Sequence, residues 1–355
     1  MVPRLLNRRL LHPADLRPSQ EDLQVVGAFN PGAVEGAGGV TLLVRVAETV
    51  REKRPGQVAL PRWDVSSGRV ATDWLAGDEV EFVDPRVVTV RCTGLRRLTF
   101  ISHLKVVSSR DGISIDAIEP VPFQPAVEAE EFGVEDPRIT LVDGRFYFTY
   151  VAVSRHGAGT ALASTVDFKT FNRHGFIFPP ENKDVVLFPE RIGGQYVALH
   201  RPNPAQHFST PEMWLAASPD LIHWGGHTPF LGGAGGWDAG RVGAGAPPIR
   251  TRAGWLEIYH GNDQRPGGAG VGRYSAGALL LDLENPRRIL AARGEILVPE
   301  TDYERDGFVP NVIFPTGIVQ RGETVLVYCG AADSATAVVE LRLRDLLNEL
   351  GQVCV

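Results

Sequence analysis

Three carboxylates stand within six residues in the stretch Glu131-Phe132-Gly133-Val134-Glu135-Asp136, which continues as Pro137-Arg138. A carboxyl group held in such a cluster can donate a proton in general acid catalysis, and it can equally be part of a solvated turn, because acidic residues are mostly exposed. Pro137 interrupts the local pattern, and an apolar alternation follows over 139–151. The stretch therefore lies at the mouth of a predicted hairpin, and residues elsewhere must decide between the two interpretations.

Polar and charged residues recur along the chain in apolar or glycine-rich surroundings, where a purely structural role is harder to assign to them. Taken singly, each has an ordinary explanation, such as an arginine paired in the core, a histidine bonded at a strand end or an aspartate that caps a turn. Their recurrence favours one shared site built from the whole chain. The residues are Asn30, Arg45, Asp136, Lys183, Asp184, Glu190, Arg201, Asp238, Arg241, His260, Tyr274 and Asp333.

The elements that must position these residues are predicted to be strands. Short apolar alternations occupy 40–44, 146–150, 196–199 and 324–328, and the turns between such segments are rich in the 39 glycines and 26 prolines. Helical periodicity is scarce and is clearest near the C-terminus, which predicts one short helix over about residues 337–351. We therefore predict an all-β protein.

The predicted turns resemble one another at intervals of roughly 50 to 60 residues, as expected for the blades of a β-propeller. They are Ser109-Arg110-Asp111-Gly112, Ser164-Thr165-Val166-Asp167, Ser218-Pro219-Asp220 and Leu281-Asp282-Leu283-Glu284. A β-sandwich or two β-domains with coincidental turns are the alternatives. No linker divides the chain, which predicts a single domain over 1–355 with an N-terminal extension over about residues 1–28. In a propeller the inner strands converge on one axis, so distant residues meet in one pocket.

Composition excludes several classes of protein. The 355 residues, 43% of them apolar, suffice for a sizeable core, and the net charge of −6 gives no bulk attraction to nucleic acid or an anionic membrane. Three scattered cysteines, Cys92, Cys329 and Cys354, suit neither a disulfide framework nor a zinc site. Since the sequence shows no apolar leader or spanning segment, we expect a soluble cytoplasmic protein without a metal or organic cofactor. A homo-oligomer is compatible with this composition, and the oligomeric state stays open.

An ordered series of motifs runs from Phe29 to Asp333 and resembles glycoside hydrolase family 130. The motifs are Gly133-Val134-Glu135-Asp136-Pro137-Arg138, Leu187-Phe188-Pro189, His200-Arg201-Pro202, Ser218-Pro219-Asp220, His223-Trp224, Gly243-Ala244-Gly245, Tyr259-His260-Gly261, Gly307-Phe308-Val309-Pro310-Asn311-Val312 and Gly330-Ala331-Ala332-Asp333. The resemblance implies a five-bladed β-propeller that cleaves β-mannosides with inversion, mostly by phosphorolysis and in some members by hydrolysis.

Matched residue by residue, the resemblance implies that Asp136 is the general acid of an Asp-Pro-Arg motif. It places Asn30, Arg45 and Asp333 in the sugar pocket, and we add Asp238 to these substrate-binding residues. The phosphate-binding positions are matched by Lys183, Arg201, Arg241, His260 and Tyr274, although some phosphorylases carry arginine at the first and lysine at the third. Both departures keep the positive charge and change its hydrogen-bond geometry.

The nucleophile decides the reaction. If it is phosphate, the protein needs one carboxylic acid and a cationic cradle, and β-1,2-linked mannooligosaccharides would yield α-mannose 1-phosphate. If it is water, a second carboxylate must activate the water from about 6.5 to 9.5 Å away. Glu190 stands where mannosyl-glucose phosphorylases of the family carry an arginine, so it is either the base or an ion-pair partner of Arg191 or Lys183 without a chemical role. Asp184 and Asp238 are weaker candidates for the base. We expect phosphorolysis, with an inverting β-1,2-mannosidase as the alternative.

Two further interpretations stay open. Five-bladed arabinanases and fructan-processing enzymes share the expected architecture, but they use an Arg-Asp-Pro motif where this chain has Glu135 before Asp136. A non-catalytic sugar-binding propeller would not need Asp136 as an acid. The segments 203–210 and 263–272 are expected to rim the acceptor side of the pocket, and a small oligosaccharide and inorganic phosphate are the expected partners.

Overall fold

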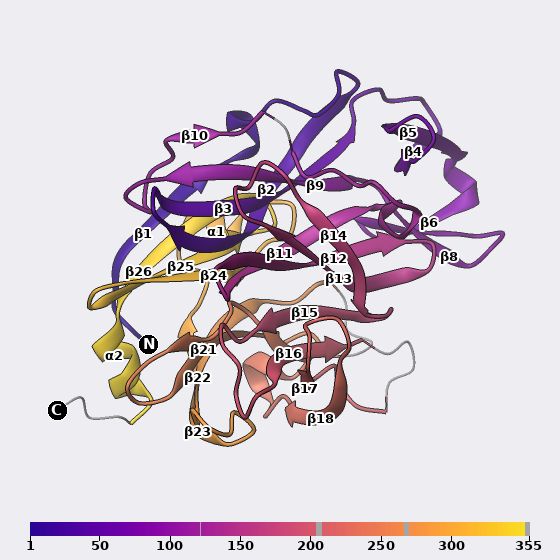
Figure 1. Cartoon of the computed structure of the whole chain (residues 1–355). Coiled ribbons are helices and arrows are strands. Elements are labelled where there is room, and N and C mark those ends of the chain that lie inside the picture. The colour runs from indigo at the N-terminus through magenta and orange to yellow at the C-terminus, as the bar shows by residue number, and fades with distance from the viewer. Residues whose placement is uncertain (121, 204–207, 266–269, 352–355) are drawn as a thin grey trace.

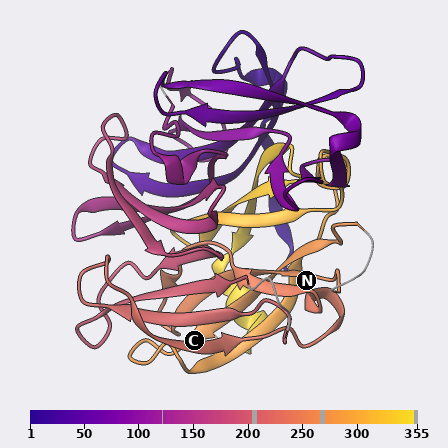
Figure 2. The same ribbon diagram turned by 90° about the vertical axis from the view of Figure 1, so that its right-hand side faces the viewer.

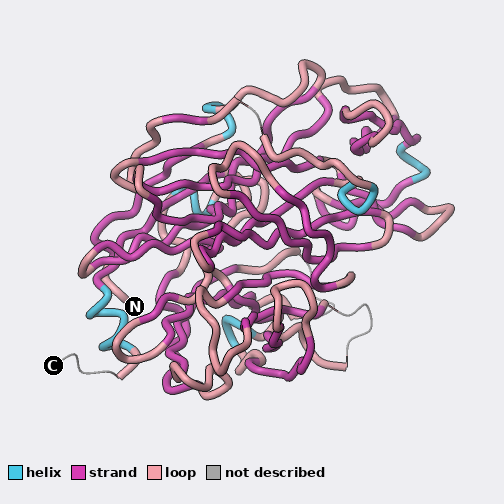
Figure 3. The backbone as a smooth tube through the Cα atoms, viewed as in Figure 1, coloured by secondary structure: helices cyan, strands magenta, loops and turns pink. Residues whose placement is uncertain are grey.

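The computed structural model describes residues 1–120, 122–203, 208–265 and 270–351. Strands dominate these ranges and helices are short (Figure 3), which confirms the predicted all-β class. The described helices are α1 (Asp302–Arg305) and α2 (Leu343–Glu349), with 3-10 turns η1 (Pro13–Asp15), η2 (Gly77–Glu79), η3 (Glu128–Glu130) and η4 (Gly236–Asp238). None of the helices in these ranges is long and apolar enough to cross a bilayer.

Five antiparallel sheets of four or more strands follow one another along the described chain (Figure 1). Sheet 1 contains β2 (Leu23–Gly36), β3 (Gly39–Val50), β9 (Ile101–Ser109) and β10 (Ala117–Ile118). Sheet 2 contains β11 (Gly133–Val142), β12 (Arg145–Ser154), β13 (Gly157–Thr165) and β14 (Asn172–Phe178). Sheet 3 contains β15 (Asn182–Leu187), β16 (Tyr196–Pro202), β17 (Met213–Ser218) and β18 (Gly225–Leu231). Sheet 4 contains β19 (Arg241–Ala244), β20 (Ile249–Arg250), β21 (Trp255–Asn262), β22 (Tyr274–Leu281) and β23 (Ile289–Leu297).

Sheet 5 joins the two ends of the chain. It contains β24 (Ile313–Arg321), β25 (Thr324–Ala331) and β26 (Ala335–Arg342), with β1 (Arg4–Leu11) paired to β26. The segment that the sequence sets apart as an N-terminal extension thus supplies an edge strand. The predicted helix over 337–351 is wrong in its first six residues, which belong to β26. Those residues have ladder partners in both β25 and β1, and this pairing prevails over helical periodicity until the β1 ladder ends.

The core lies between the sheets. Separate buried apolar clusters fill the interfaces of sheet 1 with sheet 2, sheet 2 with sheet 3, sheet 3 with sheet 4, sheet 4 with sheet 5 and sheet 5 with sheet 1. In β25, Val325 and Val327 face the cluster shared with sheet 4, while Leu326 and Tyr328 face the cluster shared with sheet 1. Apolar residues on both faces of one strand explain its continuous apolar run.

A segment between β3 and β9, residues 51–100, forms two small sheets beside sheets 1 and 2, and we call it the insertion. One contains β4 (Gln57–Asp64) and β5 (Arg69–Ala76), and the other contains β6 (Val80–Asp84), β7 (Val87–Val90) and β8 (Leu95–Leu98). Trp63 donates its backbone N–H to the carbonyl of Glu131 at 2.7 Å, so the insertion packs against the carboxylate-rich stretch. Figures 1 and 2 both place the yellow C-terminal strands between the purple strands, which include the insertion, and the orange strands of sheet 4.

Candidate active site

A cavity of about 1030 Å³ opens where the first strands of the sheets approach the insertion. It brings together residues from sheets 1 to 5 that are up to three hundred positions apart in sequence. The residues singled out from the sequence that line it are Asn30, Arg45, Asp136, Lys183, Asp184, Arg201, Arg241, His260, Tyr274 and Asp333. Most of the predicted site therefore lies in one place.

Backbone bulges turn three of these side chains into the cavity. The ladder register shifts over residues 29–32 of β2, 135–138 of β11 and 183–186 of β15, and these bulges contain Asn30, Asp136 and Asp184. Their φ angles are 48°, 49° and 55°, in the left-handed region that Asn and Asp tolerate better than other non-glycine residues. A bulge releases a side chain from the alternation of its strand, which is how regular strands can supply an active site.

Arg45 organises the carboxylates on one side of the cavity. Its Nη1 donates to Asp136 Oδ1 at 2.8 Å, its Nη2 to Glu135 Oε1 at 2.7 Å and its Nε to Ser102 Oγ at 3.1 Å. Asn30 Nδ2 donates to the same Oδ1 of Asp136 at 2.8 Å. All five side chains are buried, so these charge-assisted hydrogen bonds hold Asp136 in a single orientation.

The surroundings of Asp136 favour its ionised form. Burial opposes ionisation, but the charges of Arg45 and Arg138 and the hydrogen bond from Asn30 outweigh it and lower the pKa of the carboxyl below its usual value. Asp136 is therefore ionised at neutral pH. Because Oδ1 already accepts two hydrogen bonds, a proton that joins this carboxylate belongs on Oδ2.

Asp184 is the centre of a second, cationic group. Its Oδ2 accepts a hydrogen bond from Arg201 Nε at 2.7 Å and lies 3.4 Å from His260 Nε2, while its Oδ1 lies 3.6 Å from Arg138 Nη2. Burial opposes ionisation of Asp184, yet Arg201, His260 and Arg138 hold its pKa well below the usual value. The sequence suggested Asp184 only as a weak base candidate, and its contacts instead describe a carboxylate that orients cations.

Arg138 connects Asp136 with the cationic group. Its Nη1 donates to the backbone carbonyl of Asp136 at 2.6 Å and its Nε to the carbonyl of Gly245 at 3.1 Å. The Gly245 N–H in turn donates to Glu257 Oε1 at 3.1 Å, and burial raises the pKa of Glu257 well above its usual value. Glu257 has no signal in the sequence, because it is a single acidic residue within the apolar run of β21.

Four of the cations that line the cavity have no Asp or Glu oxygen within 4.0 Å among the described residues. They are Arg96, Lys183, Arg241 and Arg265. Both ring nitrogens of the buried His260 also lack a hydrogen-bond partner in those ranges, and burial lowers its pKa despite the nearby Asp184. Of the charged side chains that line the described cavity, nine are Arg or Lys and five are Asp or Glu, although the whole chain carries −6. The cavity is suited to an anion.

Asp333 reaches the cavity from the turn between β25 and β26, where its φ is 48°. Its Oδ2 accepts a hydrogen bond from Arg86 Nη1 of the insertion at 3.2 Å. Burial raises the pKa of Asp333, against the charges of Arg86 and Arg45. The sequence reasoning missed Arg86, because the insertion carries no matched motif.

The structure does not bring Glu190 or Asp238 to the cavity. The side chain of Glu190 is 46% exposed and pairs with Arg250 on the outer surface, which leaves it no access to a water inside the cavity. Asp238 is buried in η4 and accepts hydrogen bonds from the N–H groups of Ala234 and Gly235 at 3.2 and 2.9 Å, as a turn-capping aspartate does. Neither candidate contributes to the cavity, because Arg250 binds Glu190 and the N–H groups of Ala234 and Gly235 bind Asp238.

The segments expected to rim the acceptor side do reach the cavity in part. Asn203, Gln264, Arg265 and Gly270 line it. Residues 204–207 and 266–269 of the same predicted segments lie outside the described residues, as does Cys354.

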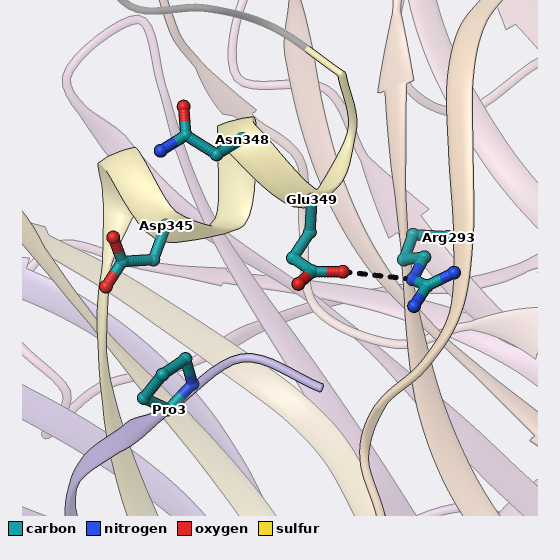
Figure 4. Close-up of a pocket in the computed structure, with 5 residues that line it drawn as sticks. All are labelled: Pro3, Arg293, Asp345, Asn348 and Glu349. Carbon is teal, nitrogen blue, oxygen red and sulfur yellow. Dashed lines mark ion pairs between the residues drawn. The ribbon is translucent and has the colours of Figure 1, made fainter.

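A second, smaller hollow lies beside α2, away from every residue predicted for the site. It has a volume of about 530 Å³ and is lined by Pro3, Arg293, Asp345, Asn348 and Glu349. Figure 4 shows Glu349 directed toward Arg293, and the Arg293 Nε–Glu349 Oε2 distance is 3.1 Å. The hollow is therefore lined by one cation and two carboxylates, Asp345 being the second, and it lacks the excess of cations found in the larger cavity.

Comparisons with known proteins agree on one family. The model of glycoside hydrolase family 130, described as beta-1,4-mannooligosaccharide phosphorylase, matches residues 76–352. A beta-1,2-mannobiose phosphorylase from Listeria innocua is 38% identical over 347 residues, which cover 96% of each chain. A 1,2-beta-oligomannan phosphorylase from Thermoanaerobacter is 37% identical over 252 residues, or 70% of this chain and 81% of that protein. The solved complex of the Listeria innocua beta-1,2-mannobiose phosphorylase with beta-1,2-mannobiose superposes with a TM-score of 0.90 over 96% of this chain and 97% of the other, at 37% identity.

Proposed function

Since the chain belongs to glycoside hydrolase family 130, we propose that it cleaves β-1,2-linked mannooligosaccharides by inverting phosphorolysis and releases α-mannose 1-phosphate. The observation that carries the proposal is the excess of cavity cations that have no carboxylate partner among the described residues, Lys183 and Arg241 among them. A phosphate dianion would supply the missing negative charge. The β-1,2 linkage rests on the two relatives named for it, one of which matches 96% of this chain.

In this proposal Asp136 is the general acid, and Asn30, Arg45 and Asp333 hold the sugar that is transferred. Lys183, Arg201, Arg241, His260 and Tyr274 bind phosphate. The separation of a carboxylate-rich group around Arg45 from a cation-rich group around Asp184 supports this division of roles.

The proposed reaction needs no separate base, because each proton that is transferred has a donor and an acceptor. The proton on Asp136 Oδ2 passes to the glycosidic oxygen, the bond from that oxygen to the anomeric carbon breaks, and a phosphate oxygen bonds to that carbon from the opposite face. Hydrogen phosphate becomes a sugar phosphate that still carries its P–OH proton, and loss of this proton restores the carboxyl of Asp136.

Phosphate also explains how an acid with a lowered pKa could be protonated. The cations that stabilise ionised Asp136 include Arg138 and Lys183, and a dianion beside Lys183 competes for the same positive charge. Occupancy of the phosphate site therefore raises the pKa of Asp136 toward the range where it can act as an acid.

The hydrolytic alternative needs a carboxylate base in the cavity. Each Asp or Glu that lines the described cavity besides Asp136 already has a partner: Glu135 pairs with Arg45, Asp184 with Arg201, Asp333 with Arg86, and Glu181 accepts the N–H of Ala158. Glu190 lies outside it. These contacts favour phosphate over activated water.

We also infer that the five sheets are the blades of a five-bladed β-propeller. Apolar clusters connect each sheet to the next, and a fifth cluster connects sheet 5 back to sheet 1. Pairing of β1 with β26 would close this ring by joining both ends of the chain in one blade.

The test is incubation with β-1,2-mannobiose in the presence and absence of phosphate. Phosphorolysis predicts equal amounts of mannose and α-mannose 1-phosphate, which ³¹P and ¹H NMR identify with their anomeric configuration, and no cleavage without phosphate. Release of mannose at the same rate without phosphate would establish hydrolysis instead. Formation of the β anomer would exclude inversion.

A further inference from the structure

The insertion delivers one charged side chain to the carboxylate side of the cavity. Arg86 stands between β6 and β7 and lines the cavity, although it belongs to none of the five large sheets. Its backbone is fixed, because its carbonyl accepts the Thr99 N–H at 2.9 Å and the carbonyl of Pro85 accepts the Thr99 hydroxyl at 2.8 Å. The side chain is 26% exposed, so it stands at the cavity wall.

The guanidinium of Arg86 is held in one plane by its neighbour Asp84. Nε donates to Asp84 Oδ1 at 3.3 Å and Nη2 donates to Oδ2 at 3.0 Å. This two-point contact leaves Nη1 directed at Asp333 Oδ2, 3.2 Å away. A bidentate contact fixes the geometry of a guanidinium, which a single hydrogen bond does not do.

We propose that Arg86 is a positioning residue for mannoside binding, which acts by holding the Asp333 carboxylate ionised and in one orientation toward the sugar. This inference rests on the proposed function, in which Asp333 accepts hydrogen bonds from sugar hydroxyls. The charged groups that face Asp333 are Arg86 from the insertion, Arg45 from β3, and Asp136 and Glu135 from β11.

Arg45 cannot replace Arg86 in this role. Its Nη1, Nη2 and Nε already bond to Asp136, Glu135 and Ser102. Without Arg86, Asp333 would face two carboxylates with no hydrogen-bonded cation of its own among the described residues. The Asp333 carboxylate would then take up a proton or turn away from the cavity. Either change would remove an acceptor of hydrogen bonds from the sugar hydroxyls.

A purely structural role for the same contact would be to fasten the insertion to sheet 5. The two roles predict different measurements. A fastening contact would change stability and affect the KM for both substrates alike, whereas a positioning contact changes the KM for the mannoside more than the KM for phosphate.

The experiment compares Arg86→Met and Arg86→Lys with the matched control Arg91→Met. Arg91 belongs to the same small region of the insertion, but it pairs with Glu81 in solvent, is 57% exposed and does not line the cavity. We expect Arg86→Met to raise the KM for β-1,2-mannobiose about tenfold or more and the KM for phosphate less than about twofold. Arg86→Lys should restore part of the mannobiose affinity, since lysine restores the positive charge but not the two-point contact of the guanidinium. Arg91→Met should have the same KM values as the wild type.

Calorimetric titration with mannose and, separately, with inorganic phosphate measures the same contrast without turnover. Unchanged mannobiose KM and mannose affinity in Arg86→Met would overturn the inference, as would an equal rise in the phosphate KM. A wild-type protein without phosphate-dependent cleavage would reject the proposed function, and weaker mannose binding by Arg86→Met would still decide the role of Arg86. If Arg86→Met fails to fold, the lysine variant carries the comparison.

Discussion

Lys183 and Arg201 are both proposed to bind phosphate, but their replacement should have different consequences for the fold. Lys183 is half-buried and has no carboxylate partner among the described residues, whereas Arg201 is 3% exposed and donates to the buried Asp184 at 2.7 Å. Replacement of each by methionine keeps most of the apolar stem. Lys183→Met should weaken phosphate binding alone, and Arg201→Met should weaken both phosphate binding and the native state.

The magnitudes follow from these contacts. A hydrogen bond to a charged group contributes about 1.5 to 3 kcal/mol, so loss of the Lys183 ammonium should raise the phosphate KM about 10- to 150-fold. Its effect on the free energy of unfolding should stay within about 0.5 kcal/mol, because no carboxylate is left unpaired. Breaking a buried ion pair costs about 3 to 5 kcal/mol. We expect the lower end for Arg201→Met, since Arg138 and His260 remain 3.6 and 3.4 Å from Asp184.

The assay is the initial rate of β-1,2-mannobiose phosphorolysis as a function of phosphate, together with urea unfolding of each variant. Lys169→Met is the control, because Lys169 is an exposed lysine in the turn before β14 and lies outside the cavity. An unchanged phosphate KM in Lys183→Met would remove Lys183 from the site. Equal losses of stability in the two variants would refute the argument that Arg201 is the principal partner of Asp184.

Four further outcomes test other contacts. Asp136→Asn keeps an oxygen that can accept both hydrogen bonds but cannot act as the acid, so kcat should fall about 10²- to 10⁴-fold while the protein stays folded, and near-normal turnover would exclude Asp136. Gly243→Ala would place a Cβ 2.5 Å from Asp184 Oδ2 and 2.6 Å from His260 Cε1, so unfolding free energy should drop by about 1 to 3 kcal/mol and the phosphate KM should rise; an unaltered variant would contradict the close packing. Because the pKa of Asp184 is lower in the folded state than in the unfolded state, its stabilising contribution is present above about pH 4 and is lost as the pH falls through the folded-state value. Asp184→Asn should therefore flatten the acid side of a stability–pH curve from urea unfolding, and an equally steep curve would argue against this shift. Glu190→Gln should leave phosphorolysis unchanged and stability within about 1 kcal/mol, because an exposed ion pair contributes little, whereas a tenfold loss of rate would return Glu190 to the reaction.

Many candidate residues were predictable because strand periodicity, turn residues and side-chain type are local properties of the sequence. The Asp136-Pro137 pair, which interrupts a strand pattern, marked the bulge that turns Asp136 into the cavity. The two other carboxylates of the stretch have different partners: Glu135 binds Arg45, and Glu131 binds Arg155 at 2.7 Å. The sequence could supply candidates of the right type, but it could not assign partners to two similar carboxylates.

The positions of Glu190 and Arg86 could not be predicted, for the same reason. Glu190 follows an apolar strand just as Asp184 precedes one, yet the first meets Arg250 at the surface and the second meets Arg201 inside the cavity. Arg86 had no sequence signal at all, since its role depends on how the insertion packs against the β25–β26 turn. Charge and pKa depend on distances of a few ångströms between segments that only folding brings together.

The sequence by itself therefore determined the strand class and the ordered motifs, which depend on side-chain periodicity and on local turn chemistry. It also determined the candidate acid and the supply of cations. Tertiary structure decided which carboxylate lines the cavity beside Arg45, which is a partner for cations and which is a surface residue. The stretch from Glu131 to Arg138 contains all the atoms of a proton donor and one nearby cation, Arg138. Arg45 and Asn30 from sheet 1 set the orientation of Asp136, and they lower its pKa together with Arg138 and with Lys183 from sheet 3.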